Sequence, residues 1–380
     1  MLNIPYHISD ISDKDGVYLQ KLCEENRLDS LGEYTTNCQK WLENNVGAER
    51  ALLTHSCTGA LEMAAILAEL KPGDEVIMPS FTFVSTATAF TLRGAVPVFV
   101  DIRPDTLNID ENKIEEAITS KTKAIVPVHY AGIGCNMEVI ERIASKHNLM
   151  IIEDAAQCLL ATYKGKPLGS FGSMATLSFH HTKNVTAGQG GALLVNDPKL
   201  VDRALIVWQK GTNREAFIQG QVDKYTWVDL GSSFLPSEIN AALLWAQFER
   251  AKAITQARVE LWDHYNKALE PLELNGKIRR PTVPEGCVHN GHIYYILLPE
   301  ADMRGPFMAA LREEGIQTTS HYVPLHLSPA GSQFGRISGD LKQAESCSAR
   351  IVRLPLWVGM EKHMSEIIGK LSALIVKFVS

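Results

Sequence analysis

The chain lacks the features that mark membrane, secreted or nucleic-acid-binding proteins. No apolar run approaches the ~20 residues of a membrane span, and the first residues, MLNIPYHISDISDKDG, have neither the basic segment nor the apolar stretch of a signal peptide. The 37 Lys and Arg are outnumbered by 43 Asp and Glu, and a net charge of -6 disfavours a nucleic-acid surface. We therefore expect a cytoplasmic protein with no membrane span and no nucleic-acid partner.

Several familiar site motifs are also missing. The seven cysteines are scattered and never form a CxxC pair, so we expect reduced thiols and neither a disulfide framework nor a zinc site. There is no P-loop and no GxSxG, and GIGC (132–135) lacks the third glycine of a dinucleotide fingerprint. No HxH or HExxH spacing is present, and the neighbours His180 and His181 would face opposite ways on a strand, so we expect no metal site.

What the sequence does have is an alternation of strand-like and helical patterns over about residues 50 to 210. Apolar runs typical of buried strands alternate with helical spacing. The strands are expected at 74–80, 95–102, 123–130 and 149–156, and the helices at 83–95 and 137–147. This alternation predicts an α/β fold, with a mostly parallel sheet flanked by helices.

The remainder of the 380 residues has a different character and predicts a second lobe. Helical spacing over 235–269 predicts a long helix that bridges two lobes. Beyond it we expect a smaller α+β lobe with a strand at 292–299 and helices near 303–314 and 364–378. The predicted division is a large domain over 1–248 and a small C-terminal domain over 249–380.

Polar residues fall at the carboxyl ends of the predicted strands, where open sheets of this kind bind ligands. They are Ser80, Asp101, His129, Asp154 and Ser178. In IIEDAAQ (151–157), a carboxylate at the end of a buried strand needs a cationic partner. Asp154 is better placed than Glu153, which would point to the opposite side of the strand. A helix cap or an internal salt bridge is the alternative reading.

Two further stretches could carry chemistry. In THSCTGALEMAAILAEL (54–70), small hydroxyl and thiol residues precede a helix, whose first N–H groups could bind phosphate or simply be capped. In LSFHHTKNVTAGQGG (177–191), Lys183 follows a predicted buried strand and precedes a glycine cluster. It is either a surface lysine or a buried amine that reacts with carbonyls. Pyridoxal 5'-phosphate (PLP) requires a phosphate cup, an acid and a lysine. Candidates for all three occur in this sequence, in that order.

Long segments of the chain resemble the nucleotide-sugar aminotransferases of the aspartate-aminotransferase superfold, fold type I. The matching segments are SCTGALEMA, GDEVIMPSFTFVSTATA, VFVDIRPDTLNID, VPVHYAG, IIEDAAQ, FGSMATLSFHHTKN and GQGGALLVND. More narrowly, GTNREAFIQGQVDKYTWVDLGSSFLPSEINAALLWAQ and HYVPLHLSPAG resemble the dTDP-4-amino-4,6-dideoxygalactose transaminases. The resemblance implies a PLP-dependent transamination of dTDP-4-keto-6-deoxy-D-glucose with L-glutamate, for cell-surface polysaccharide synthesis, by a homodimer with shared active sites.

The resemblance also implies roles for individual residues. Lys183 would hold the cofactor covalently and carry the proton, and Asp154 would keep the pyridine nitrogen protonated. Gln157 would lie near the phenolic oxygen, and Phe83 would stack on the ring. The phosphate ligands would be Thr58, the backbone at Cys57, and Ser178.

The sequence departs from the family pattern at one segment. Many relatives carry GxNxRM, whose asparagine reaches the neighbouring subunit's cofactor phosphate; here GSSFLPS places Ser233 at the asparagine and Leu235 at the arginine. His321 and His326, in SHYVPLHLSPAG, are expected on the substrate side or as structural histidines. The alternatives are the C4 epimer of the product, another keto-sugar nucleotide, a PLP-dependent dehydratase and a silent regulatory relative. The intact Lys183 favours transamination.

Overall fold

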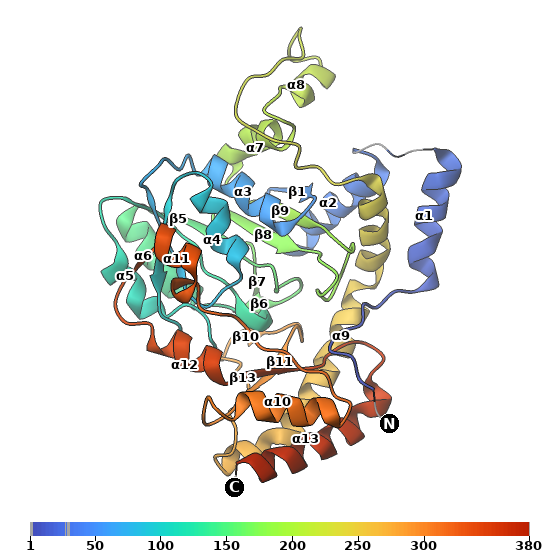
Figure 1. Ribbon diagram of the computed structural model, residues 1–380. Coiled ribbons are helices and arrows are strands. Elements are labelled where there is room, and N and C mark those ends of the chain that lie inside the picture. Colours follow the sequence, from blue (N-terminus) through green and yellow to red (C-terminus); the bar gives the residue numbers. More distant parts are fainter. Residues whose placement is uncertain (1–2, 27, 29–30, 380) are drawn as a thin grey trace.

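An eight-stranded sheet forms the centre of the larger lobe (Figure 1). The computed structural model describes residues 3–26, 28 and 31–379. Along the sheet the strands follow the order β1-β9-β8-β5-β4-β2-β3-β12. Their bounds are β1 (Arg50–Thr54), β2 (Glu75–Pro79), β3 (Val96–Val100), β4 (Thr122–Ile125), β5 (Met150–Asp154), β8 (Met174–Ser178), β9 (Gly191–Val195) and β12 (Arg336–Ile337). Neighbouring strands are parallel except at β9, which runs antiparallel to β8 and β1, so the predicted mostly parallel α/β sheet is confirmed.

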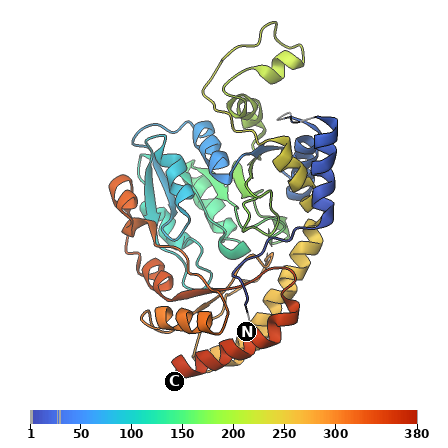
Figure 2. The same ribbon diagram turned by 45° about the vertical axis from the view of Figure 1, so that its right-hand side comes forward.

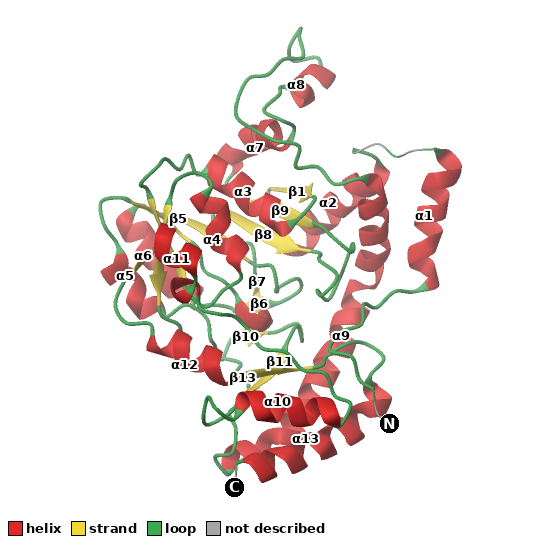
Figure 3. Cartoon of the chain, viewed as in Figure 1, coloured by secondary structure: helices red, strands yellow, loops and turns green. Residues whose placement is uncertain are grey.

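The strands are buried on both faces because each face packs against helices (Figure 3). In β2, Ile77 belongs to the apolar core on one face, and Met78 belongs to the core on the other. Two-sided burial produces the continuous apolar runs by which these strands are recognised in the sequence. The first core includes side chains of α1 (Asp13–Glu25), α2 (Glu33–Val46) and α6 (Met137–His147), and the second includes side chains of α3 (Cys57–Leu67), α4 (Val84–Thr91) and α7 (Val201–Trp208).

The long helix α9 (Glu238–Leu274) belongs to both lobes. Its first half, including Phe248, packs into the first core, and its second half, including Trp262, packs into a third core in the smaller lobe. The helix predicted over 235–269 is therefore present and continues to Leu274. The smaller lobe adds the antiparallel pair β11 (Tyr294–Leu297) and β13 (Ile351–Leu354), with α10 (Arg304–Glu313) and α13 (Met364–Phe378), and α13 lies along the end of α9 (Figure 2).

Two segments cross between the lobes. Ile4 packs into the third core and pairs with Ile316. In the opposite direction, β12 extends the sheet of the larger lobe by pairing with β3. The division of the chain into two domains after residue 248 stays a proposal. The N-terminal segment and β12 each pack against the lobe on the other side of that division.

Two elements end earlier than the sequence predicts. The helix expected over 83–95 stops at Thr91, because a turn through Gly94 (φ +76°) redirects the chain into β3. The strand expected over 123–130 ends at Ile125.

The other elements are α5 (Ile114–Ala117), α8 (Arg214–Ile218), α11 (Pro329–Phe334), α12 (Lys342–Arg350), β6 (Thr162–Tyr163), β7 (Lys166–Pro167) and β10 (Cys287–Val288). Among the described residues, no helix combines the length and apolar character needed to cross a membrane.

Candidate active site

A cavity of about 600 Å³ lies at the carboxyl ends of β5 and β8, bounded by both lobes. Most of the residues expected at the site line it, although they come from segments far apart in the chain. These are Cys57, Thr58, Phe83, Asp154, Gln157, Ser178, Lys183 and His321. The larger lobe thus supplies most of this set, and His321 comes from the smaller one.

Lys183 lies in the loop that follows β8, where its backbone N–H donates to the His180 carbonyl. Burial lowers the pKa of its amine, and the nearby Asp154 offsets part of this shift. Desolvation disfavours the ammonium form, so a larger fraction of the amine is neutral near pH 7 than in water. A neutral amine can both attack a carbonyl and accept a proton.

Asp154 ends β5 with its carboxylate directed at the cavity, and it is only 5% exposed. The Thr86 hydroxyl donates to its Oδ2 at 2.7 Å, and the Ala156 N–H donates to its Oδ1 at 3.2 Å. The carboxylate has acceptor capacity left beyond these two bonds. It can therefore accept a further bond from a cationic N–H in the cavity.

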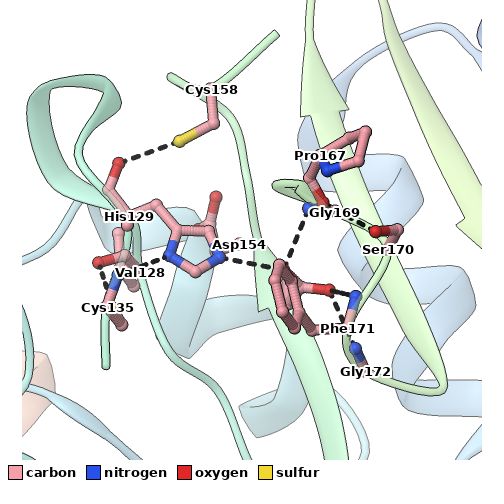
Figure 4. A network of polar contacts seen from close by, with 12 residues as sticks. Val128, His129, Cys135, Asp154, Cys158, Pro167, Gly169, Ser170, Phe171 and Gly172 are labelled. Carbon is pink, nitrogen blue, oxygen red and sulfur yellow. Dashed lines mark hydrogen bonds and ion pairs between the residues drawn. The ribbon is translucent and has the colours of Figure 1, made fainter. Parts of the chain in front are cut away.

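The preceding residue, Glu153, is directed to the opposite side of β5, as the strand period predicts. Its carboxylate accepts hydrogen bonds from the N–H groups of Gly169, Phe171 and Gly172, and lies 3.0 Å from His129 Nε2. Figure 4 shows the His129 ring facing the loop that contains these residues. Glu153 thus serves the packing of the loop against β5 and not the cavity.

The start of α3 forms an anion-binding corner of the cavity. Ser56 is the N-cap, with its Oγ accepting from Gly59 N at 3.0 Å, so the N–H groups of Cys57 and Thr58 remain without intrahelical acceptors. Burial raises the pKa of the Cys57 thiol to about 12, so it adds no negative charge there. A Cβ on Gly191 would lie 2.4 Å from Cys57 N, so only glycine lets β9 pass this close to the helix start. Such a corner suits a phosphate group.

Gln157 and Phe83 form another wall. The Ala131 N–H donates to Gln157 Oε1 at 2.7 Å, and Gln157 Nε2 donates to the Tyr322 hydroxyl at 3.1 Å. Phe83 precedes α4 and is 56% exposed, so its ring is free to cover a flat ligand. The cavity thus combines an amine, a carboxylate, a helix start and an aromatic surface, and this combination fits PLP.

Two arginines, the buried Arg258 and the partly buried Arg353, line the cavity and were not expected from the sequence. Among the ion pairs of the described residues, neither has a carboxylate partner. Arg353 donates to His321 Nε2, and its guanidinium lies 5.1 Å from the centre of the Tyr6 ring. Arg258 donates to the carbonyls of Gly291 and His292, and burial lowers its pKa to about 10. The charge of Arg353 in the apolar run IVRLPL is the signal that could have indicated it.

Two expected residues do not line the cavity. His326 lies between Ser80 Oγ, 2.6 Å from its Nδ1, and Glu345 Oε1, 3.1 Å from its Nε2. Of the two roles considered for His326, the structure favours the structural one, because both ring nitrogens already have partners. Ser233 is exposed and forms a backbone bridge with Gln209, away from the cavity of its own chain. Within the described ranges, no group of three or more His, Cys, Asp or Glu is arranged to hold a metal ion.

Comparisons with known proteins agree with this geometry. The model of the DegT/DnrJ/EryC1/StrS aminotransferase family matches residues 9–372. The chain is 33% identical over 365 residues to the spore coat polysaccharide biosynthesis protein SpsC of Bacillus subtilis, covering 94% of this chain and 93% of that protein. It is 32% identical over 362 residues to GDP-perosamine synthase of Caulobacter vibrioides, covering 94% of this chain and 95% of the relative.

A solved structure shares the whole fold. The putative sugar aminotransferase Spr1654 from Streptococcus pneumoniae, in its PMP form, superposes with a TM-score of 0.92 at 26% identity, covering 99% of this chain and 100% of the other. The match extends over both lobes. This chain belongs to the DegT/DnrJ/EryC1/StrS aminotransferase family, and it is a PLP-dependent sugar aminotransferase.

Proposed function

We propose that the protein transfers the amino group of L-glutamate to C4 of dTDP-4-keto-6-deoxy-D-glucose, giving dTDP-4-amino-4,6-dideoxy-D-galactose. The observation that carries the proposal is the meeting of Lys183 and Asp154 in one cavity with two arginines that have no carboxylate partner among the residues the structure describes. PLP, when bound, supplies the electron sink for transfer of an amino group. The protein's own groups hold it, orient it and move the proton.

The roles follow from position. Lys183 Nζ would hold the cofactor, and after its release would carry the proton between the reacting carbons. Asp154 would keep the ring nitrogen protonated, with Gln157 near the phenolic oxygen and Phe83 against the ring. The phosphate would lie at the start of α3, near Cys57 N, Thr58 and Ser178 Oγ.

The two arginines support an anionic amino donor. Among the described residues, neither the buried Arg258 nor the partly buried Arg353 has a carboxylate partner. Removing a guanidinium from water without a counter-ion is costly, so binding of an anion in the cavity is favoured. Glutamate brings two carboxylates. We assign the recognition of glutamate to Arg353, with Arg258 adding positive charge nearby. The two arginines lie close enough to interact with each other, and both add to the lowering of the pKa of His7 that burial causes.

His321 supports this assignment by holding Arg353. Burial lowers the pKa of the His321 imidazole, which keeps the ring neutral and leaves Nε2 free to accept from the guanidinium. The other nitrogen, Nδ1, lies 3.1 Å from the Tyr130 hydroxyl. His321 would therefore act on the substrate through Arg353.

A nucleotide other than dTDP is the main competing substrate, because one relative is named GDP-perosamine synthase. The test is to incubate the PLP-loaded enzyme with glutamate and either dTDP-4-keto-6-deoxyglucose or a GDP-linked 4-keto-6-deoxyhexose. NMR coupling constants of the product then assign the configuration at C4. We expect the galacto amino sugar in the dTDP reaction, with one 2-oxoglutarate formed for each amino sugar.

Each other outcome overturns a defined part of the proposal. The gluco epimer would correct the stereochemistry, and amination in the GDP reaction alone would correct the nucleotide. A deoxygenated product would indicate a dehydratase. The relative named for spore coat polysaccharide biosynthesis supports the proposal that the product is used for a cell-surface polysaccharide.

We also propose a homodimer with shared active sites. The segment around α8 projects from the larger lobe (Figure 1) and exposes apolar side chains, among them Phe217 and Trp227, the latter 74% exposed. Ser233 lies at the base of this segment and would contact the partner's cofactor phosphate. Light scattering that gave the mass of a single chain would contradict the dimer.

A further inference from the structure

Asp154 is supported from behind by a pair of buried threonine hydroxyls. Thr86 Oγ1 lies 2.7 Å from Asp154 Oδ2, and Thr82 Oγ1 lies 2.8 Å from Thr86 Oγ1. Both threonines are at most 1% exposed, and Thr82 borders the cavity. They lie on either side of Phe83, so one turn of chain at the start of α4 contributes the aromatic surface and the hydroxyl pair.

The direction of these bonds follows from the chemistry of the groups. An ionised carboxylate can only accept hydrogen bonds, so the Thr86 hydroxyl must donate to Asp154. A hydroxyl has one proton, and Thr86 must then accept from Thr82. The result is a chain of donors, from Thr82 to Thr86 to Asp154, that ends on the carboxylate.

Such a chain has two effects on Asp154. A hydrogen bond donated to a buried carboxylate offsets part of the cost of removing that carboxylate from water. The bond also fixes the rotation of the carboxyl group, because Oδ2 is held by Thr86 and Oδ1 by Ala156 N. A fixed carboxylate presents its remaining lone pairs to the cavity in one direction.

We propose that Thr82 and Thr86 are positioning residues, which hold the Asp154 carboxylate in the orientation that keeps the ring nitrogen of the cofactor protonated. This inference rests on the role proposed above for Asp154. Thr86 touches neither cofactor nor substrate, and acts only through the carboxylate. Thr82 reinforces Thr86 by donating to it.

The test compares Thr86→Val with Thr86→Ser, which keeps the hydroxyl. Thr88→Val, at an exposed position on the same helix, is the matched control. We expect Thr86→Val to weaken the apparent Kd for PLP about tenfold, the loss of one hydrogen bond to a charged group. Thr86→Ser should restore most of the affinity, and Thr82→Val should show a smaller loss than Thr86→Val.

Nitrogen-15 NMR of enzyme loaded with PLP labelled at the ring nitrogen provides a readout that does not depend on activity. The signal should move toward the unprotonated position in Thr86→Val and stay at the wild-type position in Thr86→Ser and Thr88→Val. Circular dichroism and the Tm of each apoenzyme check that the variants are folded. If Thr86→Val did not fold, the same comparison would be made with Thr82→Val, which leaves the bond from Thr86 to Asp154 in place.

Asp154→Asn separates the two proposals. If Asp154→Asn shifts the nitrogen signal and weakens PLP binding while both threonine variants match the wild type, the inference is wrong and the role of Asp154 stands. If Asp154→Asn itself changes neither quantity, the role proposed for Asp154 fails. A nitrogen signal shifted by Thr86→Val and restored by Thr86→Ser would support both.

Discussion

Glu153 and Asp154 are neighbours in β5 and serve opposite sides of the sheet. Glu153 is fully buried against His129 and the 169–172 loop, whereas Asp154 faces the cavity and is bonded to Thr86. Side chains alternate between the two faces of a strand, and this alternation alone places the structural acid Glu153 and the candidate catalytic acid Asp154 on opposite sides. Substitutions at the two positions should therefore have different consequences.

Glu153→Gln should destabilise the fold. It removes the charge that faces His129 and places an amide near the N–H donors of the 169–172 loop. We expect the free energy of unfolding from urea denaturation to fall by about 1–3 kcal/mol, since leaving a buried hydrogen-bonding group without its partner typically costs about that much. Asp154→Asn, the control, should weaken PLP binding with little change in the Tm of the apoenzyme.

Lys183→Ala should abolish transamination and the visible absorbance of covalently held PLP. Its neighbours in the loop are unchanged, so the circular dichroism spectrum should match that of the wild type. Absorbance spectra of the protein after gel filtration in PLP provide the measurement. Persistence of the visible band would mean that another lysine holds the cofactor.

Arg353→Ala should raise the KM for glutamate. Loss of a charge-assisted contact worth about 1.5–3 kcal/mol corresponds to about a 10- to 100-fold change. The KM for the keto sugar should change less, because we assign Arg353 to the amino donor. Steady-state kinetics with each substrate varied in turn provides the comparison, and Arg312→Ala, at an exposed position, is the control. Equal effects on both substrates would contradict the assignment.

The two histidines of the 321–326 segment should differ in their effects. His321→Phe keeps an aromatic ring against Tyr322, 4.0 Å away, but removes the acceptor for Arg353, so the KM for glutamate should rise. His326→Phe removes the contacts with Ser80 and Glu345, so it should lower the Tm and leave both KM values unchanged. The loss of stability should be about 1–3 kcal/mol, the usual cost of leaving a buried polar partner unsatisfied. A changed KM in the folded His326→Phe enzyme would place that residue at the substrate.

Lowering the pH should destabilise the protein through protonation of His7, which lies in the N-terminal segment. Burial lowers the pKa of His7 from 6.5 to about 4, with Arg258 and Arg353 adding to the shift, while its Nε2 donates to the His181 carbonyl at 2.6 Å. Between about pH 4 and 6.5 the unfolded chain binds a proton that the folded chain does not, so stability falls as the pH drops through this window.

The pH dependence of the Tm measures this effect. His7→Gln keeps a donor for the His181 carbonyl and removes the titration, so its Tm should fall less than that of the wild type between pH 6.5 and 4. Identical curves for the two proteins would exclude His7 as the group that responds.

The sequence by itself determined the order of strands and helices and the main chemical residues. Apolar runs reveal strands because both faces of the sheet are covered, and the position of Asp154 relative to Glu153 follows from a period of two. The resemblance of long segments in the right order gave the family, which a matching family model then showed. These features are local, or depend on order along the chain.

Only the tertiary structure decided which distant residues meet. Thr86 reaches Asp154 across 68 positions, and Tyr6 lies beneath Arg353 because the N-terminal segment packs into the smaller lobe. No local period encodes such contacts. The same reason explains His326, five residues from His321: a short turn directs one ring toward Arg353 and the other toward Ser80 and Glu345. The roles of these residues therefore depend on long-range packing of the two lobes at the edge of the sheet.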